Sequence, residues 1–244
     1  MHNMANPYFE FKQFTVFHDR CAMKVTTDAC LFGAWCASEI KETEVKVVNA
    51  LDIGAGTGLL SLMLAQQNNI EIDAVEIDEK AALQASENFE SSPWKNRLKI
   101  IHGNILNLPL PRKYDCIISN PPFYENELQS GNALRNTAHH SHQLKLEELL
   151  DIINEKLEDN GLFYLLLPFK RQAETERLLQ QKNLFAVKEV WVYPSTQHAP
   201  FRLLIKGAKK APLQKVMYRL DIKNDSGKYT SEFIALLKEY YLYL

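Results

Sequence analysis

A short glycine-rich segment contains the first residues whose types and spacing fit a chemical role. Gly54, Gly56 and Gly58 alternate with other residues, and Asp52 lies two positions before the first of them. Glycine lets a chain turn tightly and approach a ligand where a Cβ atom would collide. A dinucleotide fingerprint needs another glycine at position 59, which is Leu59, and an aspartate repels phosphate but attracts a cationic amine. The segment favours a cofactor that carries an amine, although a turn that serves packing alone has a similar composition.

A second acidic side chain follows at the end of the next expected strand. Glu76 comes 24 positions after Asp52. A carboxylate at a strand end can accept hydrogen bonds from both hydroxyls of a ribose. Acidic residues at such places also serve as solvated charges or helix caps, and Asp78 fits the role of a cap. We therefore predict that Glu76 binds a ribose diol.

A third segment, Asn120-Pro121-Pro122-Phe123, follows an apolar strand directly. An exocyclic amine on a nucleobase is a weak nucleophile, and two acceptors on its N–H groups stabilise the positive charge that develops during transfer. The Asn120 side-chain oxygen and the Pro121 carbonyl fit these two acceptors, and prolines restrict the backbone that holds them. Phe123 offers a face on which a flipped-out base stacks. An Asn-Pro-Pro turn without chemistry is the alternative.

The elements around these segments alternate between strands and helices. Strand patterns cover 47–54, 70–77, 97–103, 114–120 and 161–167, and helical spacing of apolar residues covers 58–67, 79–89, 145–157 and 170–181. This alternation predicts an α/β fold with a parallel sheet between two helical layers. In such sheets ligands bind at the carboxyl ends of the strands, where all three segments stand.

The two ends of the chain depart from that alternation. Residues 185–194, 201–209 and 213–222 read as strands without helices between them, which predicts an antiparallel edge, and 231–244 reads as a closing helix. Two short strand patterns at 8–12 and 14–17 and a helix at 28–35 begin the chain. We expect a single domain over 1–244, with an N-terminal extension at 1–44 and a catalytic core at 45–244.

The three segments resemble those of class I methyltransferases that use S-adenosylmethionine (SAM), whose Rossmann-like sheet has seven strands. The run FHDRCAMKVTTDACLFGAW, the loop LDIGAGTGLLSL, NPPF and the ending YTSEFIALLKEYYL are similar to the bacterial tRNA1(Val) (adenine(37)-N6)-methyltransferase family. This resemblance implies methylation of tRNA at N6 of an adenine, namely adenine 37 of a valine tRNA. The cofactor contacts that it implies, besides Asp52, Glu76 and the three glycines, are Met23, Lys24, Val25, Thr27, Asp28, Asn104, Ile105 and Asn120. Asn104 stands where many members have Asp, and Thr27 and Asp28 also fit the cap of the helix that follows.

Charge is segregated along a chain whose formal net charge is −2. Eight basic and two acidic residues lie between Arg202 and Lys228, which fits phosphate contact with RNA, although solvated surfaces carry such runs as well. The histidines at 139, 140 and 142 lack the spacing and the local carboxylate of a metal site, so we expect no metal. The residues expected to contact RNA are Arg135, His139, His140, Lys209, Lys210 and Arg219.

Composition sets the class of protein. With 46% hydrophobic and 24% charged residues in 244, the chain suits a globular protein with a full core. We see no membrane span and no signal peptide, and the spacing of the four cysteines predicts free thiols, so we expect a cytoplasmic enzyme without an obligate protein partner. The alternatives are methylation of guanine N2 in rRNA, adenine in DNA or a glutamine side chain, and a non-catalytic protein that binds SAM or RNA. A nicotinamide-linked oxidoreductase is more distant because of Leu59.

Overall fold

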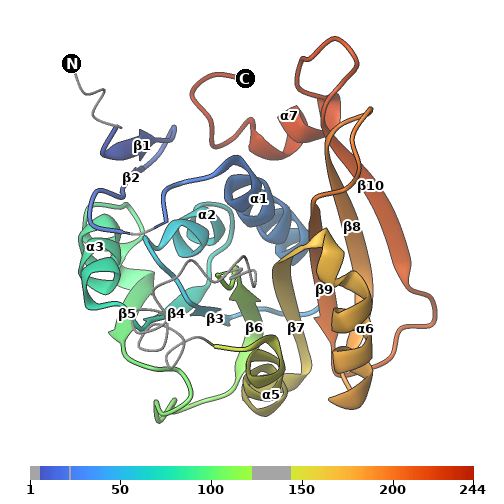
Figure 1. The fold of residues 1–244 in the computed structure, drawn as a ribbon. Helices are drawn as coiled ribbons and strands as arrows, with labels where there is room; N and C mark the ends of the chain where they lie inside the picture. Colours follow the sequence, from blue (N-terminus) through green and yellow to red (C-terminus); the bar gives the residue numbers. More distant parts are fainter. Residues whose placement is uncertain (1–5, 22, 123–143) are drawn as a thin grey trace, which may run out of the picture.

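The structure, a computed structural model, describes residues 6–21, 23–122 and 144–244. Within these ranges an eight-stranded sheet has the order β10-β8-β9-β7-β6-β3-β4-β5, and a hairpin, β1-β2, lies outside it (Figure 1). The strands are β1 (Tyr8–Glu10), β2 (Thr15–Phe17), β3 (Asn49–Ile53), β4 (Glu71–Glu76), β5 (Leu98–His102), β6 (Tyr114–Ser119), β7 (Leu157–Pro168), β8 (Phe185–Ser195), β9 (Arg202–Ala208) and β10 (Val216–Lys223). The helices are α1 (Thr27–Glu42), α2 (Leu59–Gln67), α3 (Glu79–Glu90), α5 (Leu146–Lys156), α6 (Gln172–Gln181) and α7 (Ser231–Leu237), with short 3₁₀ turns η1 (Lys95–Arg97) and η2 (Phe169–Arg171).

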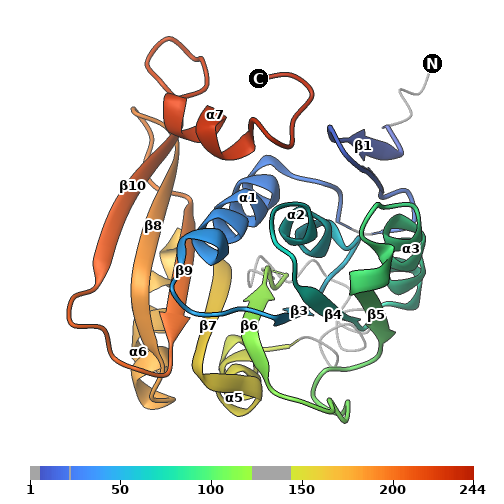
Figure 2. The same cartoon turned by 180° about the vertical axis from the view of Figure 1, so that it is seen from behind.

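The central strands bury side chains on both faces of the sheet because successive residues of a strand point in opposite directions. In β3, Ala50 belongs to the hydrophobic cluster that includes α1, α2 and α7, whereas Leu51 and Ile53 belong to the cluster that includes α5 and α6. Tyr164 and Phe163 of β7 divide in the same way. The two views show these helices on opposite sides of the sheet (Figures 1 and 2). The α/β fold with a mostly parallel sheet is confirmed.

The sheet has eight strands instead of the expected seven, and the C-terminal strands account for the difference. In this sheet β9 alone is antiparallel to its neighbours, β7 and β8, which confirms the antiparallel pairing near the C-terminus. The chain then crosses to the far side of β8, where β10 pairs parallel with it as an eighth strand. β10 cannot pair with β9, because β7 and β8 already occupy both edges of that strand. The carboxyl ends of the parallel strands and the beginning of β9 therefore share one edge.

The N- and C-terminal segments pack against the same core. Phe11, Phe14 and Val16 join the cluster that contains α1 and α2, and an isolated bridge links Phe11 to Tyr241. The closing helix is shorter than expected, since α7 ends at Leu237. All four cysteines are free, as their spacing predicted. No helix in the described ranges is long and apolar enough to cross a membrane.

Candidate active site

The glycine loop after β3 adopts a backbone that other residues rarely tolerate. Gly54, Gly56 and Gly58 have φ angles of 74°, 54° and 79°, all in the left-handed region. A Cβ atom at Gly58 would lie 2.4 Å from the ring of Phe89, whereas one at Gly54 or Gly56 would meet no atom within 4 Å. The first two glycines thus face open space in which a ligand fits, and the third allows close packing between α2 and α3.

The end of β4 fixes the position of this loop. The amides of Gly54 and Ala55 donate to the Val75 carbonyl over 2.9 and 3.1 Å, and the Gly56 amide donates to Glu76 Oε2 over 2.7 Å. The Asp78 amide donates to Glu76 Oε1 over 2.8 Å. Each carboxylate oxygen keeps a second lone pair, so Glu76 remains able to accept from a ribose while it holds the loop. Asp78 caps α3 through the amide of Ala81, as expected.

Asp52 lies deeper than its place before the loop suggested. The two-residue period of β3 turns its side chain toward α2, where it is 0% exposed and accepts a 2.7 Å hydrogen bond from the Ser61 hydroxyl at Oδ2. Its Oδ1 is buried without a hydrogen-bond partner among the described residues. Burial raises the pKa of Asp52 to about 7, and the Ser61 hydrogen bond opposes that rise. The sequence analysis did not name Ser61. Its single hydroxyl in the apolar helix expected at 58–67 was a signal that this side chain has a polar partner.

The loop after β5 places Asn104 and Ile105 at the same edge. The amide of Gly103 donates to the Glu76 carbonyl over 2.9 Å, which ties this loop to the end of β4. The Asn104 side-chain oxygen accepts from the Leu106 amide over 3.0 Å and thereby stabilises its own turn. Both Asn104 and Ile105 are half-buried. This local hydrogen bond gives Asn104 a structural role in addition to the predicted contact with the cofactor.

The Asn-Pro-Pro segment begins where β6 ends beside β3. The Ser119 hydroxyl donates to the Ile53 carbonyl over 2.8 Å and joins the two strands at the points where their loops begin. The Asn120 side-chain oxygen is buried and has no hydrogen-bond partner among the described residues. Pro121 is buried and Pro122 is exposed. Among the described residues, the structure therefore presents a desolvated hydrogen-bond acceptor at Asn120.

The N-terminal run leads into α1 and is linked to the C-terminal strands. Thr26, not Thr27 or Asp28, caps α1 by accepting from the Ala29 amide over 3.4 Å. Asp28 accepts a 2.6 Å hydrogen bond from Arg202 at the beginning of β9. Burial raises the pKa of Asp28, but hydrogen bonds from Thr26 and Arg202 and the Arg202 charge outweigh this effect and leave the pKa below its ordinary value.

The other residues of this run lie at the surface. Met23 is 54% exposed, Lys24 is exposed and Val25 is half-buried. The Thr27 side chain lines a pocket formed with the loops after β8 and β10. Phe123, Arg135, His139 and His140 lie outside the described residues. Within the described part of the chain, no three His, Cys, Asp or Glu side chains are grouped as metal ligands.

Two residues expected to contact RNA are separated from this edge. Because β9 is antiparallel, its last residue, Ala208, pairs with Leu162 near the amino ends of the parallel strands. Lys209 and Lys210 follow it there, where they donate to the Leu157 carbonyl over 2.8 Å and to the side chain of Asn160 over 2.6 Å. The structure does not bring these two lysines together with the glycine loop and Asn120.

The basic run is also less free than its sequence suggested. Arg219 pairs with Asp221 over 2.8 Å and lies 4.0 Å from the centre of the Tyr193 ring. Salt bridges join four other members of the run to acidic side chains on distant elements: Arg202–Asp28, Lys206–Glu39, Lys209–Asp159 and Lys215–Glu189. These long-range pairs reduce the positive charge that remains for an RNA backbone.

Known proteins share this sequence and fold. A family model described as methyltransferase small domain matches residues 36–187. Relatives named tRNA1(Val) (adenine(37)-N6)-methyltransferase occur in Parabacteroides distasonis, 38% identical over 241 residues (98% of this chain and 99% of the relative), and in Bacteroides fragilis, 38% identical over 248 residues (98% and 99%).

Solved structures agree on the fold. Protein Atu636 of Agrobacterium tumefaciens, described as a predicted O-methyltransferase, has a TM-score of 0.66 at 15% identity and covers 87% of this chain and 96% of its own. The glycopeptide N-methyltransferase MtfA, solved with SAM, has a TM-score of 0.53 at 13% identity, with 72% and 93% covered. At these identities the likeness concerns the fold.

A glycine loop at the carboxyl edge of such a sheet is how class I methyltransferases hold SAM, and this protein is a SAM-dependent methyltransferase of that class. Its identity of 38% over nearly its full length to the relative in Parabacteroides distasonis identifies the family within that class. The chain belongs to the tRNA1(Val) (adenine(37)-N6)-methyltransferase family.

Proposed function

We propose that this protein transfers the methyl group of SAM to N6 of adenine 37 in a valine tRNA. The observation that carries the proposal is the buried Asn120 side-chain oxygen, which has no hydrogen-bond partner in the described part of the chain and stands before two prolines beside the glycine loop. The name shared by the full-length relatives supports the choice of base and RNA. The cytoplasm as location and a reaction without an obligate protein partner belong to the same proposal, as does a single methyltransferase domain over 1–244.

The residues at the edge fit SAM by their chemistry. Asp52 Oδ1 is a buried acceptor without a partner, which suits the ammonium of the methionine moiety. Glu76 is fixed beside the loop and suits the ribose hydroxyls, and the open space at Gly54 and Gly56 suits close approach of the cofactor. We assign Met23, Lys24, Val25, Thr27, Asp28, Asn104, Ile105 and Asn120 to the remaining cofactor contacts.

Bound SAM supplies a methyl group activated by a positively charged sulfur. The chain's own part is to hold the target amine. The Asn120 oxygen accepts one N–H of that amine and the Pro121 carbonyl accepts the other, which stabilises the positive charge that develops on nitrogen. Pro122 restricts the turn, and Phe123 stacks on the flipped base. Because both acceptors are fixed before the base arrives, little reorganisation accompanies transfer.

The test is transfer of labelled methyl from SAM to unmodified tRNA, followed by nucleoside digestion and mass spectrometry. We expect N6-methyladenosine from the wild type and a single-turnover rate ~10²–10³-fold lower for Asn120→Ala, with SAM still bound. Asn96→Ala, at an exposed position in η1, is the matched control and should keep the wild-type rate. Full turnover by Asn120→Ala would refute the mechanism, and product only on rRNA, DNA or glutamine would refute the substrate.

A further inference from the structure

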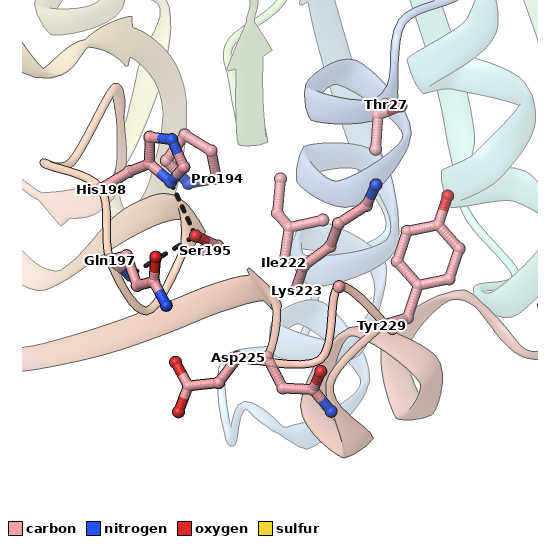
Figure 3. Close-up of a pocket in the computed structure, with 11 residues that line it drawn as sticks. Thr27, Pro194, Ser195, Gln197, His198, Ile222, Lys223, Asp225 and Tyr229 are labelled. Atoms are coloured by element: carbon pink, nitrogen blue, oxygen red, sulfur yellow. Dashed lines mark hydrogen bonds between the residues drawn. The ribbon is translucent and has the colours of Figure 1, made fainter.

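A pocket of about 560 Å³ lies at the same edge as the candidate active site, on the side of the C-terminal strands. Its walls come from the loop after β8 (Ser195 and His198), from the end of β10 (Lys223) and from Tyr229 and Thr27. Figure 3 shows the Lys223 side chain extending toward Thr27, with Tyr229 on one side and His198 on the other. Neither the glycine loop nor the Asn-Pro-Pro segment contributes to its lining.

The loops that form the pocket are held by hydrogen bonds of their own. The Thr196 hydroxyl donates to Asp225 and so links the loop after β8 to the loop after β10. The side-chain oxygen of Asn224 accepts from the amides of Ser226 and Lys228, over 3.0 and 3.1 Å, and closes the second loop. The pocket is therefore built before any ligand arrives.

The charges around the pocket favour an anion beside an aromatic ring. The Lys223 ammonium lies 6.0 Å from the centre of the Tyr229 ring and, among the described residues, has no acidic partner within salt-bridge distance. His198 Nδ1 is engaged by the Ser195 hydroxyl over 2.6 Å, which directs hydrogen bonding to a ligand toward Nε2. Asp225, the acidic side chain of the lining, points away from Lys223 and contacts Thr196 (Figure 3). The Tyr229 ring is stacked on Phe233, with ring centroids 4.5 Å apart, so it offers a ligand only its other face and its edge, beside Lys223. A cation beside an aromatic ring is the combination that binds a nucleotide of a single strand.

The strand order fixes the distance between the pocket and Asn120. Ser195 and Lys223 end β8 and β10 in register, and Asn120 follows the end of β6. β8 is three strands from β6 and β10 is four, and the registers place Ser195 and Lys223 five residues farther along their strands than Asn120. At ~4.8 Å for each step across the sheet and ~3.3 Å for each residue along it, the separation is roughly 22–25 Å. Bases stacked in a strand are ~3.4 Å apart, so this distance corresponds to about seven nucleotides.

We propose that this pocket binds a phosphate-bearing nucleotide of the substrate RNA that flanks the target adenine, with Lys223 on the phosphate and Tyr229 beside the base or ribose. The inference rests on the proposed function, because it takes the strand entering the active site to be RNA. A subsite at this distance fixes the register of the strand and selects which adenine reaches Asn120. The pocket brings Lys223, a member of the basic run, together with Thr27 and the loop after β8, which lie far from it in the chain.

The experiment measures binding of a fluorescein-labelled anticodon stem-loop of valine tRNA by anisotropy over a series of KCl concentrations. We expect Lys223→Ala to weaken binding about five- to tenfold. The slope of log K against log salt should fall by ~0.7, the value for one lost phosphate contact on a single strand. KM for tRNA should rise by a similar factor, while kcat at saturating tRNA and the Kd for SAM stay within about twofold.

Two variants control for charge and for folding. Lys113→Ala removes the same charge at an exposed position just before β6, at the opposite edge, and should leave both affinity and slope unchanged, whereas Lys223→Arg should restore them. Equal effects of Lys223→Ala and Lys113→Ala, or no effect of Lys223→Ala in an enzyme that methylates tRNA, would overturn the assignment of the pocket and leave the proposed function standing. A wild type that makes no N6-methyladenosine overturns the proposed function, and the salt slopes then test the pocket separately.

Discussion

Asp52→Asn should stabilise the cofactor-free protein while abolishing cofactor binding. The Asp52 carboxylate is 0% exposed, and among the described residues the Ser61 hydroxyl is the single side chain that donates a hydrogen bond to it. An ionised carboxylate in this position is destabilising, because burial takes away water without supplying a counter-charge. We infer that the SAM ammonium supplies that counter-charge. Asp52 therefore contributes to cofactor binding and lowers the stability of the cofactor-free protein.

The size of the effect follows from the pKa of Asp52, which burial raises from 3.8 to about 7. At ~1.36 kcal/mol for each pH unit, ionised Asp52 destabilises the folded protein by about 4 kcal/mol above pH 7. An asparagine amide removes the charge but leaves buried N–H groups without acceptors, which costs ~1–3 kcal/mol. The net gain is about 2 kcal/mol at pH 8, equivalent to a Tm rise of ~4–8 °C for a chain of this length.

The sign of the pH dependence is fixed by the raised pKa. Between 3.8 and about 7 the folded protein holds a proton that the unfolded chain has released, so the stability of the wild type falls as the pH rises through this window. At pH 5 the wild-type carboxyl is neutral in the fold, and the advantage of Asp52→Asn should disappear. SAM should raise the Tm of the wild type but not that of the variant.

Differential scanning calorimetry at pH 5 and pH 8, with and without SAM, checks these expectations. Glu44→Gln is the matched control, since it removes one carboxylate charge at an exposed position and should shift the Tm by less than about 1 °C at either pH. A Tm for Asp52→Asn at or below that of the wild type at pH 8, or SAM stabilisation equal to that of the wild type, would refute the reasoning.

Two further predictions concern the loop and the partly buried ion pairs. Gly58→Ala brings a Cβ atom to 2.4 Å from the Phe89 ring at a φ of 79°, so we expect a loss of ~2–4 kcal/mol in urea unfolding. Gly56→Ala, with open space around it, should lose only ~1–2 kcal/mol, and equal losses would contradict the steric argument. Glu39→Ala leaves its two lysine partners without a shared carboxylate and should lose ~2–4 kcal/mol at pH 7. Burial raises the pKa of Glu39, but hydrogen bonds and charge from these lysines outweigh burial and hold the pKa below its ordinary value. The stabilities of the variant and the wild type should therefore converge as the pH falls through this pKa in acid. A stability difference that stays constant with pH would argue against the ion pairs.

The sequence alone determined the parts of the protein that depend on neighbouring residues. The apolar period of β3, β4 and β6 predicted parallel strands, and a glycine or proline segment directly after such a strand must lie at the carboxyl edge. Gly54, Glu76 and Asn120 therefore meet at one edge for a reason that is visible in the chain itself. The family followed from the glycine loop and NPPF together with the N-terminal run FHDRCAMKVTTDACLFGAW and the ending YTSEFIALLKEYYL, because each is a pattern of neighbouring residues.

The tertiary structure decided what depends on the order and direction of the strands. Asp52 turned out to be buried and paired with Ser61 because of the side on which α2 covers β3. Lys209 lies at the opposite edge because β9 alone is antiparallel to its neighbours in this sheet. Several residues of the basic run form salt bridges with acidic residues on elements far away in the chain. The pocket at Lys223 exists because β10 was added beyond β8. The Arg202–Asp28 and Lys206–Glu39 pairs join residues more than a hundred positions apart, and no local pattern encodes which strands become neighbours.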